Sequence, residues 1–378
     1  MKPPHLLVLS RRIWLHGVGG MERHTQELVE ALQALGWRVT VATAPGVRPV
    51  PPDPALRILT VPGADPRGYG RAWRRGLLPL VERLYHQDPY LGILSQSTAG
   101  APLLLWAAER RLPLCFVVHT TARDQLREPV EWSARGLYRR VRAAWAWREN
   151  RRLLPTVPLL AAVSAEVAER LRRDLEGQGR LHVMDHGIDP QCFRPPRPGE
   201  REAARRRFGL PLEQVVVGAS GRLTRQKGIG ELSQWRPSAI WLALSGEGGG
   251  IGGEGGVSWV GPLDKQGQGA FLRALDLFAF PSRHREGMPL AVLEAMATGL
   301  AVVAYRQPAL EGVLGEGRGV LVETAGEFYQ ALEGLAKQPA RRAAMGEAAL
   351  QWAASHLPPW PVQVAGLLEA MGLSAEGR

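Results

Sequence analysis

Residues 5–10 read His5-Leu6-Leu7-Val8-Leu9-Ser10, an apolar run of strand length. Apolar and small residues then recur at helical spacing from about Met21 to Leu35, and Gly36 follows them. A second apolar run comes next, Arg38-Val39-Thr40-Val41-Ala42-Thr43. Strand–helix–strand segments of this kind build parallel sheets with right-handed crossovers. The start of the chain therefore predicts an α/β fold.

The same alternation continues along the chain. Residues 114–118 and 159–163 are continuous apolar runs, as expected for strands covered by helices on both faces. Residues 193–200 are rich in proline and charge, which is typical of a link between domains. Four more strands are expected after this link, at residues 215–218, 239–244, 277–280 and 301–304.

We therefore expect two Rossmann-like α/β domains that face each other across a cleft. The first covers residues 1–195 and the second residues 196–360, and residues 361–378 form a C-terminal helix expected to return to the first domain. Ligands of such domains bind beyond the carboxyl ends of the strands.

The composition is that of an ordinary globular protein, with 45% hydrophobic and 22% charged residues among 378. Two cysteines cannot build a disulfide framework. The start lacks the features of a signal peptide, and no apolar stretch reaches the roughly 18 residues that span a bilayer. We expect a cytoplasmic protein that is soluble or peripheral on the inner face of the membrane. The net charge of +11 indicates either scattered solvated arginines or an anionic partner.

The strongest indication of a ligand lies in residues 286–299. They read Glu286-Gly287-Met288-Pro289-Leu290-Ala291-Val292-Leu293-Glu294-Ala295-Met296-Ala297-Thr298-Gly299. Pro289 suits the first position of a helix, and Gly299 suits the residue after its end. Only Glu294 interrupts the apolar helix, so we expect a buried helix with a paired carboxylate. Either Glu294 pairs with an arginine in a core helix, or the segment binds a sugar joined to a nucleotide by a diphosphate.

A glycine-rich loop follows the first predicted strand, Gly17-Val18-Gly19-Gly20-Met21-Glu22. It lacks the third glycine of a dinucleotide-binding fingerprint, and the second strand has no acidic residue at its end. Gly19 and Gly20 remain as a pair at a helix N-terminus. The pair suits either a tight turn or the close approach of a phosphate or sugar.

A basic loop opens the second predicted domain, Gly221-Arg222-Leu223-Thr224-Arg225-Gln226-Lys227-Gly228. Arginine grips phosphate oxygens with its fork, and lysine adds a point charge. An isolated pair of this kind is usually a solvated surface. Because Arg222 and Lys227 follow a strand in the same domain as Glu286, we interpret them as phosphate ligands.

At this point the chain resembles a retaining glycosyltransferase of family 4 with the two-domain GT-B fold. The resemblance covers nearly the whole length, and its specificity lies in the order and spacing of several weak motifs. These motifs are Gly19-Gly20-x-Glu22, His119 after an apolar strand, Val163-Ser164, Gly187-Ile188-Asp189 before Phe193, Gly221-Arg222-Leu223 with Lys227-Gly228, and Glu286-x7-Glu294 with Glu311 beyond.

The resemblance implies a role for each matched residue. Glu286 would bind the hydroxyls of the donor sugar, and Glu294 the ribose of the nucleotide. Arg222 and Lys227 would stabilise charge that builds on the diphosphate. His119 would touch the transferred sugar. The remaining donor contacts would come from Gly287, Met288, Pro289 and Leu290, and from Gly19 and Gly20 across the cleft.

The two cations would do the work that a metal ion does elsewhere, and no Asp-x-Asp metal motif is evident. The resemblance thus implies a nucleotide-sugar donor and neither a metal ion nor another cofactor. UDP is favoured over GDP as the carrier. The chain departs from the family here, because residues 246–259, which normally include a helix before the next strand, are shortened to a glycine-rich loop. The region beyond Val260 normally contributes to the base pocket. A Tyr305-Arg306-Gln307-Pro308 segment also replaces a common glycine pair near the sugar.

The resemblance places the acceptor on the N-terminal domain, where arginines and aromatic residues alternate. Leu137, Val141, Ala144 and Trp145 form an apolar stripe at helical spacing. A basic helix with such a stripe either packs on its domain or lies on an anionic membrane surface. We expect a glycan or lipid-linked acceptor of cell-envelope or surface polysaccharide synthesis. The candidate acceptor or membrane contacts are Glu22, Arg71, Arg74, Arg75, Arg139 and Arg140.

Other functions remain open at this stage. A nucleotide-sugar epimerase or a phosphorylase can share the GT-B fold, and a non-catalytic sugar-binding relative can share the motifs. The positive charge also fits a nucleic-acid-binding protein, but no module of that class is present. The basic loop together with the two glutamates favours sugar transfer.

Overall fold

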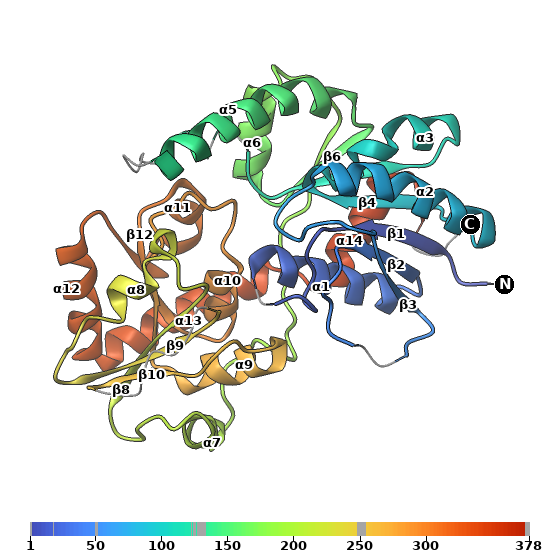
Figure 1. Ribbon diagram of the computed structural model, residues 1–378. Helices are drawn as coiled ribbons and strands as arrows, with labels where there is room; N and C mark the ends of the chain where they lie inside the picture. Colours follow the sequence, from blue (N-terminus) through green and yellow to red (C-terminus); the bar gives the residue numbers. More distant parts are fainter. Residues whose placement is uncertain are drawn as a thin grey trace. The chain divides into compact units, whose positions relative to one another are not determined.

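The computed structural model describes residues 2–17, 19–49, 52–121, 123, 126, 134–247 and 255–374 (Figure 1). The chain forms two compact units. Unit 1 contains the residues up to Gly17, residues 21–186 and the chain from Trp360 onward. Unit 2 contains residues 187–359 together with the glycine pair at 19 and 20.

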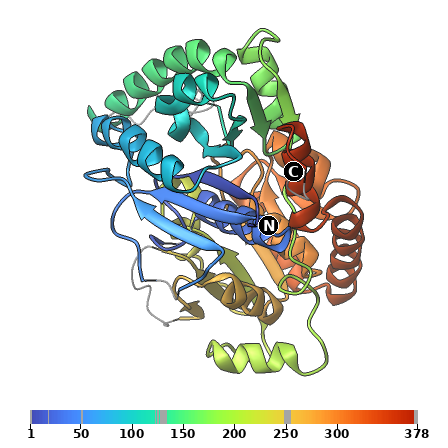
Figure 2. The ribbon, with the colours of Figure 1, turned by 90° about the vertical axis from the view of Figure 1, so that its right-hand side faces the viewer.

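The division differs from the predicted boundary at residue 195, because residues 187–195 belong to unit 2. Ile188, Cys192 and Phe193 are buried in the core of that unit, so the segment is part of its fold and not a solvated link. The C-terminal helix α14 (Trp360–Ala370) belongs to unit 1. This helix is drawn in red in Figures 1 and 2. Leu373, which follows it, packs on the start of strand β4, where a Cβ on Gly92 would lie 2.9 Å from its side chain.

Unit 1 is built on a parallel sheet of seven strands in the order β3-β2-β1-β4-β5-β6-β7. The predicted strands at residues 5–10, 38–43, 114–118 and 159–163 are confirmed, each within one residue at its ends. The strands are β1 (His5–Leu9), β2 (Arg38–Thr43), β3 (Leu56–Thr60), β4 (Gly92–Gln96), β5 (Leu114–Val118), β6 (Leu159–Ala162) and β7 (Leu181–Val183). The other helices of this unit are α1 (Gly20–Ala34), α2 (Arg71–Gln87), α3 (Leu104–Glu109), α5 (Ala134–Leu153) and α6 (Ala165–Asp174), with 3-10 turns at η1 (Ser97–Leu103) and η2 (Leu154–Thr156).

Unit 2 holds a second parallel sheet, of six strands in the order β10-β9-β8-β11-β12-β13. The two units are therefore the Rossmann-like α/β domains that the sequence predicts. The strands are β8 (Val215–Ser220), β9 (Ile240–Ser245), β10 (Val257–Trp259), β11 (Leu277–Phe280), β12 (Ala301–Tyr305) and β13 (Gly319–Val322). The helices are α7 (Glu200–Arg207), α8 (Ile229–Leu232), α9 (Lys265–Ala274), α10 (Leu290–Ala297), α11 (Pro308–Leu314), α12 (Ala325–Ala336) and α13 (Pro339–His356), with a 3-10 turn at η3 (Arg225–Lys227).

Helix α10 is buried, as the apolar run predicts, and only 5% of Glu294 is exposed. Pro289 precedes the first helical residue and has an extended backbone, so it is the N-cap and not the first helical position. Gly299 follows the end of the helix with a φ of +78°, the left-handed conformation that glycine adopts at helix ends. The carbonyl oxygen of Gly299 lies against Gly346 of α13. A Cβ built on Gly346 would lie only 2.2 Å from this oxygen. Glycine at 346 therefore lets the two helices pack closely.

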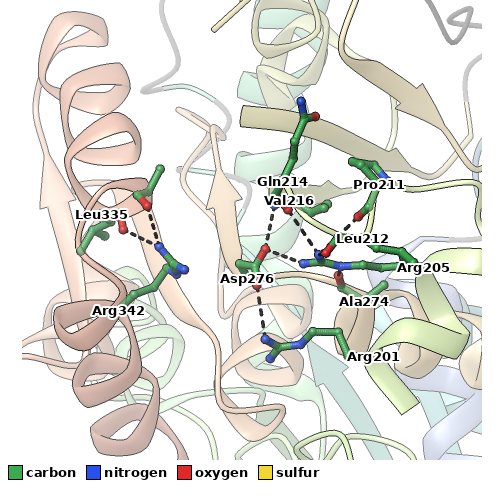
Figure 3. A network of polar contacts seen from close by, with 11 residues as sticks. Arg201, Arg205, Pro211, Leu212, Gln214, Val216, Ala274, Asp276, Leu335 and Arg342 are labelled. Carbon is green, nitrogen blue, oxygen red and sulfur yellow. Dashed lines mark hydrogen bonds and ion pairs between the residues drawn. The ribbon is translucent and has the colours of Figure 1, made fainter. Parts of the chain in front are cut away.

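A buried ion pair clamps the amino-terminal edge of the unit 2 sheet (Figure 3). Arg205 of α7 lies 2.5 Å from Asp276, which precedes β11, and both side chains are almost fully buried. Asp276 also accepts a hydrogen bond from the amide of Val216 in β8 at 2.8 Å. The Arg205 guanidinium donates to the carbonyls of Leu212 and Ala274 at 2.7 and 2.9 Å. One pair of charges thus joins two helices, a loop and a strand.

Replacing Asp276 with alanine should destabilise unit 2 by about 3–5 kcal/mol, because the Arg205 charge would stay buried without its partner. The measurement is urea denaturation followed by tryptophan fluorescence. Asp65→Ala is the matched control, because it breaks a pair with Arg67 whose side chains are 48% and 89% exposed. The control should leave the unfolding midpoint nearly unchanged. Equal midpoints for both variants would contradict the role of the clamp.

Candidate functional site

The order of the strands in unit 2 places two loops together. The sequence order reverses between β8 and β11, which are neighbours in the sheet. The loop after β8 carries Arg222 and Lys227, and the loop after β11 leads through Glu286 to α10. In open parallel sheets this switch point, at the carboxyl ends of the strands, is where ligands bind. The two anion-binding segments that the sequence predicts therefore meet at one place.

Lys227 and Glu286 form an ion pair between these loops. The side chains are 23% and 14% exposed, so water screens the pair only partly. Ser282 donates a hydrogen bond to the same carboxylate oxygen at 2.9 Å. The residue expected to bind phosphate thus lies against the residue expected to bind sugar.

Gln307 stabilises the loop that carries Glu286 through two hydrogen bonds. Its amide nitrogen donates to the carbonyl of Ser282 at 2.7 Å, and its amide oxygen accepts from the backbone N–H of Glu286 at 3.3 Å. Gln307 is 3% exposed and Ser282 is 1% exposed. Sequence reasoning noted Gln307 only as part of an unusual segment and missed Ser282. The available indication in the sequence was a glutamine directly before Pro308, since proline often begins a helix.

The two loops touch through their backbones at Gly228. This residue has a φ of +67°, and a Cβ built on it would lie 2.2 Å from the carbonyl oxygen of Pro281. Only glycine fits both the left-handed backbone and this contact. A second close approach lies beside it, where a Cβ on Gly246 would lie 1.9 Å from the carbonyl oxygen of Gly221.

The other predicted donor contacts of unit 2 lie on the same two loops and on α10. Arg222 is exposed on the first loop, and Gly287, Met288 and Leu290 lie between Glu286 and the first turn of α10. Pro289 cannot donate a backbone hydrogen bond, so it cannot be one of the amide ligands. Glu294 is buried one turn into α10. The predicted glycine-rich loop near the base lies mostly in residues 248–254, outside the described residues.

Arg283 is a further cation near this site that sequence reasoning missed. Its guanidinium lies 4.6 Å from the ring centre of Tyr305 and donates to the Tyr305 hydroxyl at 2.8 Å. It also lies 3.6 Å from Glu231 of α8. Tyr305, from the segment that replaces the glycine pair of the family, thus positions Arg283 three residues before Glu286.

Unit 1 has its own switch point, between β1 and β4. His119 follows β5 and donates from Nε2 to the Oε1 atom of Gln96 at 2.7 Å. Its ring lies 4.6 Å from that of His24 in α1, and His186 lies 5.3 Å from His24. Burial lowers the pKa of His119 to about 4, so this imidazole is neutral at pH 7. Sequence reasoning found His119 and missed the partners, since they lie far away in the sequence.

The remaining candidates are Glu22 and the arginines of unit 1, and the glycine pair that belongs to unit 2. Glu22 is buried and pairs with Arg12 at 3.1 Å. Arg74 pairs with Glu149 of α5 at 2.9 Å, while Arg71, Arg75 and Arg140 are exposed. Gly20 begins α1, and Gly19 directly precedes it. The side chain of Arg139 and all of Trp132 lie outside the described residues.

The apolar stripe of α5 is exposed to solvent. Leu137, Val141 and Trp145 of the predicted stripe are 61% to 62% exposed, and Ala144 is half-buried. The neighbouring Tyr138 is 63% exposed. Within the described ranges, no helix is both long enough and apolar enough to cross a bilayer. Nor do these ranges contain three or more histidine, cysteine or acidic side chains placed to hold a metal ion.

Comparison with known proteins gives matches in both units. Residues 18–191 match the family model described as Glycosyltransferase Family 4, and residues 215–338 match that of Glycosyl transferases group 1. A relative from Catenulispora acidiphila, D-inositol 3-phosphate glycosyltransferase 2, is 26% identical over 89% of this chain and 86% of its own length. A GDP-mannose-dependent monoacylated phosphatidylinositol monomannoside mannosyltransferase from Corynebacterium glutamicum is 27% identical over 53% of this chain and 59% of its own length. The structure of Anabaena HepE with UDP-glucose has a TM-score of 0.68 at 20% identity and covers 97% of this chain and 99% of that one.

Gly228→Ala should lower the melting temperature by several degrees, because the new methyl group would push the two loops apart. Differential scanning fluorimetry measures this change. Gly230→Ala is the matched control, since a Cβ at this helical position has nothing within 4 Å. The control should melt at or above the wild-type temperature. Unchanged melting of Gly228→Ala would show that the loops are not locked at this contact.

Proposed function

Because the chain belongs to the family 4 glycosyltransferases and has the GT-B fold, we propose that it transfers a sugar from a nucleoside-diphosphate sugar to a glycan or lipid-linked acceptor, with retention of the anomeric configuration. The observation that carries this proposal is the Lys227–Glu286 pair at the switch point of unit 2. The ammonium of Lys227 suits the phosphate groups of a ligand, and the carboxylate of Glu286 suits its sugar hydroxyls.

In this proposal Glu286 accepts hydrogen bonds from hydroxyls of the donor sugar. Ser282 and Gln307 hold the carboxylate and its backbone in place. Lys227 lies close enough to Glu286 to contact the diphosphate that joins sugar and nucleoside. As the bond between the anomeric carbon and the phosphate oxygen breaks, negative charge grows on the diphosphate. Fixed cations at Lys227 and Arg222 stabilise this charge more in the transition state than in the ground state.

The remaining roles follow from burial and charge. Glu294 is a buried carboxylate in an apolar helix. Such a carboxylate needs a hydrogen-bonding partner, and the ribose hydroxyls of a bound nucleotide would be one. Neutral His119 donates to Gln96 through one nitrogen, and its other nitrogen is assigned to the transferred sugar. We retain UDP as the favoured carrier; HepE binds UDP-glucose, whereas the Corynebacterium relative uses GDP-mannose. The reaction is proposed to need neither a metal ion nor another cofactor.

Thermal shift with nucleotides and nucleotide sugars tests the donor site, because a bound ligand raises the melting temperature by mass action. UDP and UDP-glucose should stabilise the wild-type protein more than GDP and GDP-mannose. Arg222→Ala should lose most of the shift from both UDP ligands. Glu286→Gln should keep the shift from UDP but lose the extra shift from the sugar.

Glu231→Gln is the control for these variants, since Glu231 is half exposed near the same loops. It should behave like the wild-type protein. A wild-type protein that responds to no nucleotide would refute the donor assignment. If GDP and GDP-mannose raise the melting temperature more than UDP and UDP-glucose, the carrier is GDP and not UDP.

We also propose that α5 docks unit 1 on an anionic lipid surface at the cytoplasmic face of the membrane. Its exposed stripe is bordered by arginines, of which Arg140, Arg142 and Arg148 are exposed. Apolar side chains that enter the headgroup region and arginines that face phosphate groups together favour an anionic bilayer. Such docking would bring a lipid-linked acceptor to the enzyme.

The full chain should therefore sediment with phosphatidylglycerol vesicles at low salt and much less with phosphatidylcholine vesicles. The double variant Val141→Asp/Trp145→Asp should lose this binding. Leu105→Asp is the matched control, because Leu105 is 82% exposed on α3 and not on α5. Equal sedimentation with both kinds of vesicle, or full binding by the double variant, would exclude docking through α5.

A further inference from the structure

Gln96 is the last residue of β4, and its side chain lies between two histidines of unit 1. Its amide oxygen accepts a hydrogen bond from Nε2 of His119 at 2.7 Å, and its amide nitrogen lies 3.4 Å from Nδ1 of His24. We propose that Gln96 is a positioning residue, which fixes the imidazole of His119 so that its other nitrogen, Nδ1, can only accept a hydrogen bond. The contact of Nδ1 with the transferred sugar rests on the proposed function, whereas the fixed imidazole itself does not.

The two distances determine which way the amide of Gln96 points. A contact of 2.7 Å is typical of an N–H group that faces an oxygen, so the short contact to His119 suits the amide oxygen. The contact of 3.4 Å to His24 is long for a hydrogen bond to oxygen, and it suits an amide N–H that faces a ring nitrogen. With the amide reversed, the short contact would join two nitrogen atoms and the long contact would join a nitrogen to an oxygen. The proton of His119 therefore lies on Nε2.

The three side chains in this row are uncharged at pH 7. Burial lowers the pKa of His119 to about 4. Burial and the two neighbouring histidines also lower the pKa of His24 well below its ordinary value. Because a neutral imidazole carries a single proton, a proton on Nε2 of His119 leaves a lone pair on Nδ1. This nitrogen then suits a hydroxyl group that donates, such as one of a sugar.

The backbone of Gln96 is held on both sides. Its carbonyl oxygen accepts from the hydroxyl of Tyr69 at 2.9 Å, and burial raises the pKa of Tyr69 to about 12, so the hydroxyl keeps its proton. The next residue, Ser97, turns the chain with a φ of +56°. Ser95 stabilises this turn, because its hydroxyl donates to the carbonyl of Ser97 at 2.9 Å and accepts from the amide of Gly100 at 2.7 Å. The side chain of Gln96 therefore starts from a fixed point.

Burial protects the contacts of Gln96 from water. Gln96 is 1% exposed and His24 is 0% exposed, so water does not compete for the bond between them. The ring of His24 packs against those of His186 and Trp360, with 5.3 and 5.2 Å between ring centres. These side chains all belong to unit 1. His24 thus fixes the amide of Gln96, and the amide in turn fixes the ring of His119.

NMR of the full chain with isotope-labelled histidine tests the fixed imidazole without any ligand. The wild-type protein should show an Nε2–H proton of His119 that exchanges slowly with water, and the signal is assigned by its absence in His119→Asn. Gln96→Met keeps the length of the side chain but removes the acceptor. Its Nε2–H proton should exchange at least about fivefold faster, which corresponds to one lost hydrogen bond. Gln96→Glu keeps an oxygen in the same place, so its proton should exchange no faster than in the wild-type protein.

Thr40→Val is the matched control, because it removes another buried hydrogen bond to a histidine of unit 1, the contact of 2.8 Å between Thr40 and His5. It should leave the signal of His119 unchanged. Absence of a slowly exchanging Nε2–H proton in the wild-type protein would overturn the proposal. Equal exchange in the wild-type protein and Gln96→Met, or faster exchange in Gln96→Glu, would also overturn it. The wild-type measurement and Gln96→Glu keep the test decisive if Gln96→Met does not fold.

Isothermal titration calorimetry with UDP and UDP-glucose tests the contact with the sugar. Gln96→Met should bind UDP like the wild-type protein, since UDP lacks the sugar. The ratio of the dissociation constant for UDP-glucose to that for UDP should rise about fivefold, because one hydrogen bond to the sugar is lost. An unchanged ratio would overturn the contact with the sugar. A wild-type protein that binds neither ligand would reject the donor assignment, while the exchange of the His119 proton would still decide the role of Gln96.

Discussion

The contact between Gly228 and the carbonyl of Pro281 is the constraint on which the candidate site depends. It brings the loop after β8 against the loop after β11, at a distance that no residue with a Cβ allows. Lys227 then meets Glu286, and Ser282 and Gln307 complete the surroundings of the carboxylate. A cation and an anion from distant parts of the chain are thus held in place before any ligand arrives. Preorganisation of this kind avoids the cost of moving charges during a reaction.

The two units treat charge in different ways. Unit 2 presents paired but partly exposed charges at its switch point. Unit 1 holds the neutral His119 against the amide oxygen of Gln96. A charged diphosphate suits the first environment, and an uncharged hydroxyl-bearing acceptor suits the second. This difference between the two units agrees with the proposed transfer of a sugar from a nucleotide to a hydroxyl-bearing acceptor.

Much of the fold could be predicted because each strand is a local signal. The continuous apolar run at residues 114–118 became a strand with the predicted ends, and so did residues 38–43. Errors arose where tertiary packing overrode a local rule. Pro289 caps α10 and does not begin it. The predicted link at residues 193–200 begins with Phe193, whose side chain is buried in the core of unit 2.

The sequence by itself determined the fold class, the family and the chemical types at the site, because strand periodicity and loop motifs are properties of neighbouring residues. Only the tertiary structure decided which of those residues meet. Lys227 and Glu286 are 59 positions apart, and the order of strands in the sheet makes them partners. His119 and Gln96 likewise meet because β4 and β5 are neighbours in the sheet of unit 1. The physical reason is that a parallel sheet gathers the ends of distant strands at one edge.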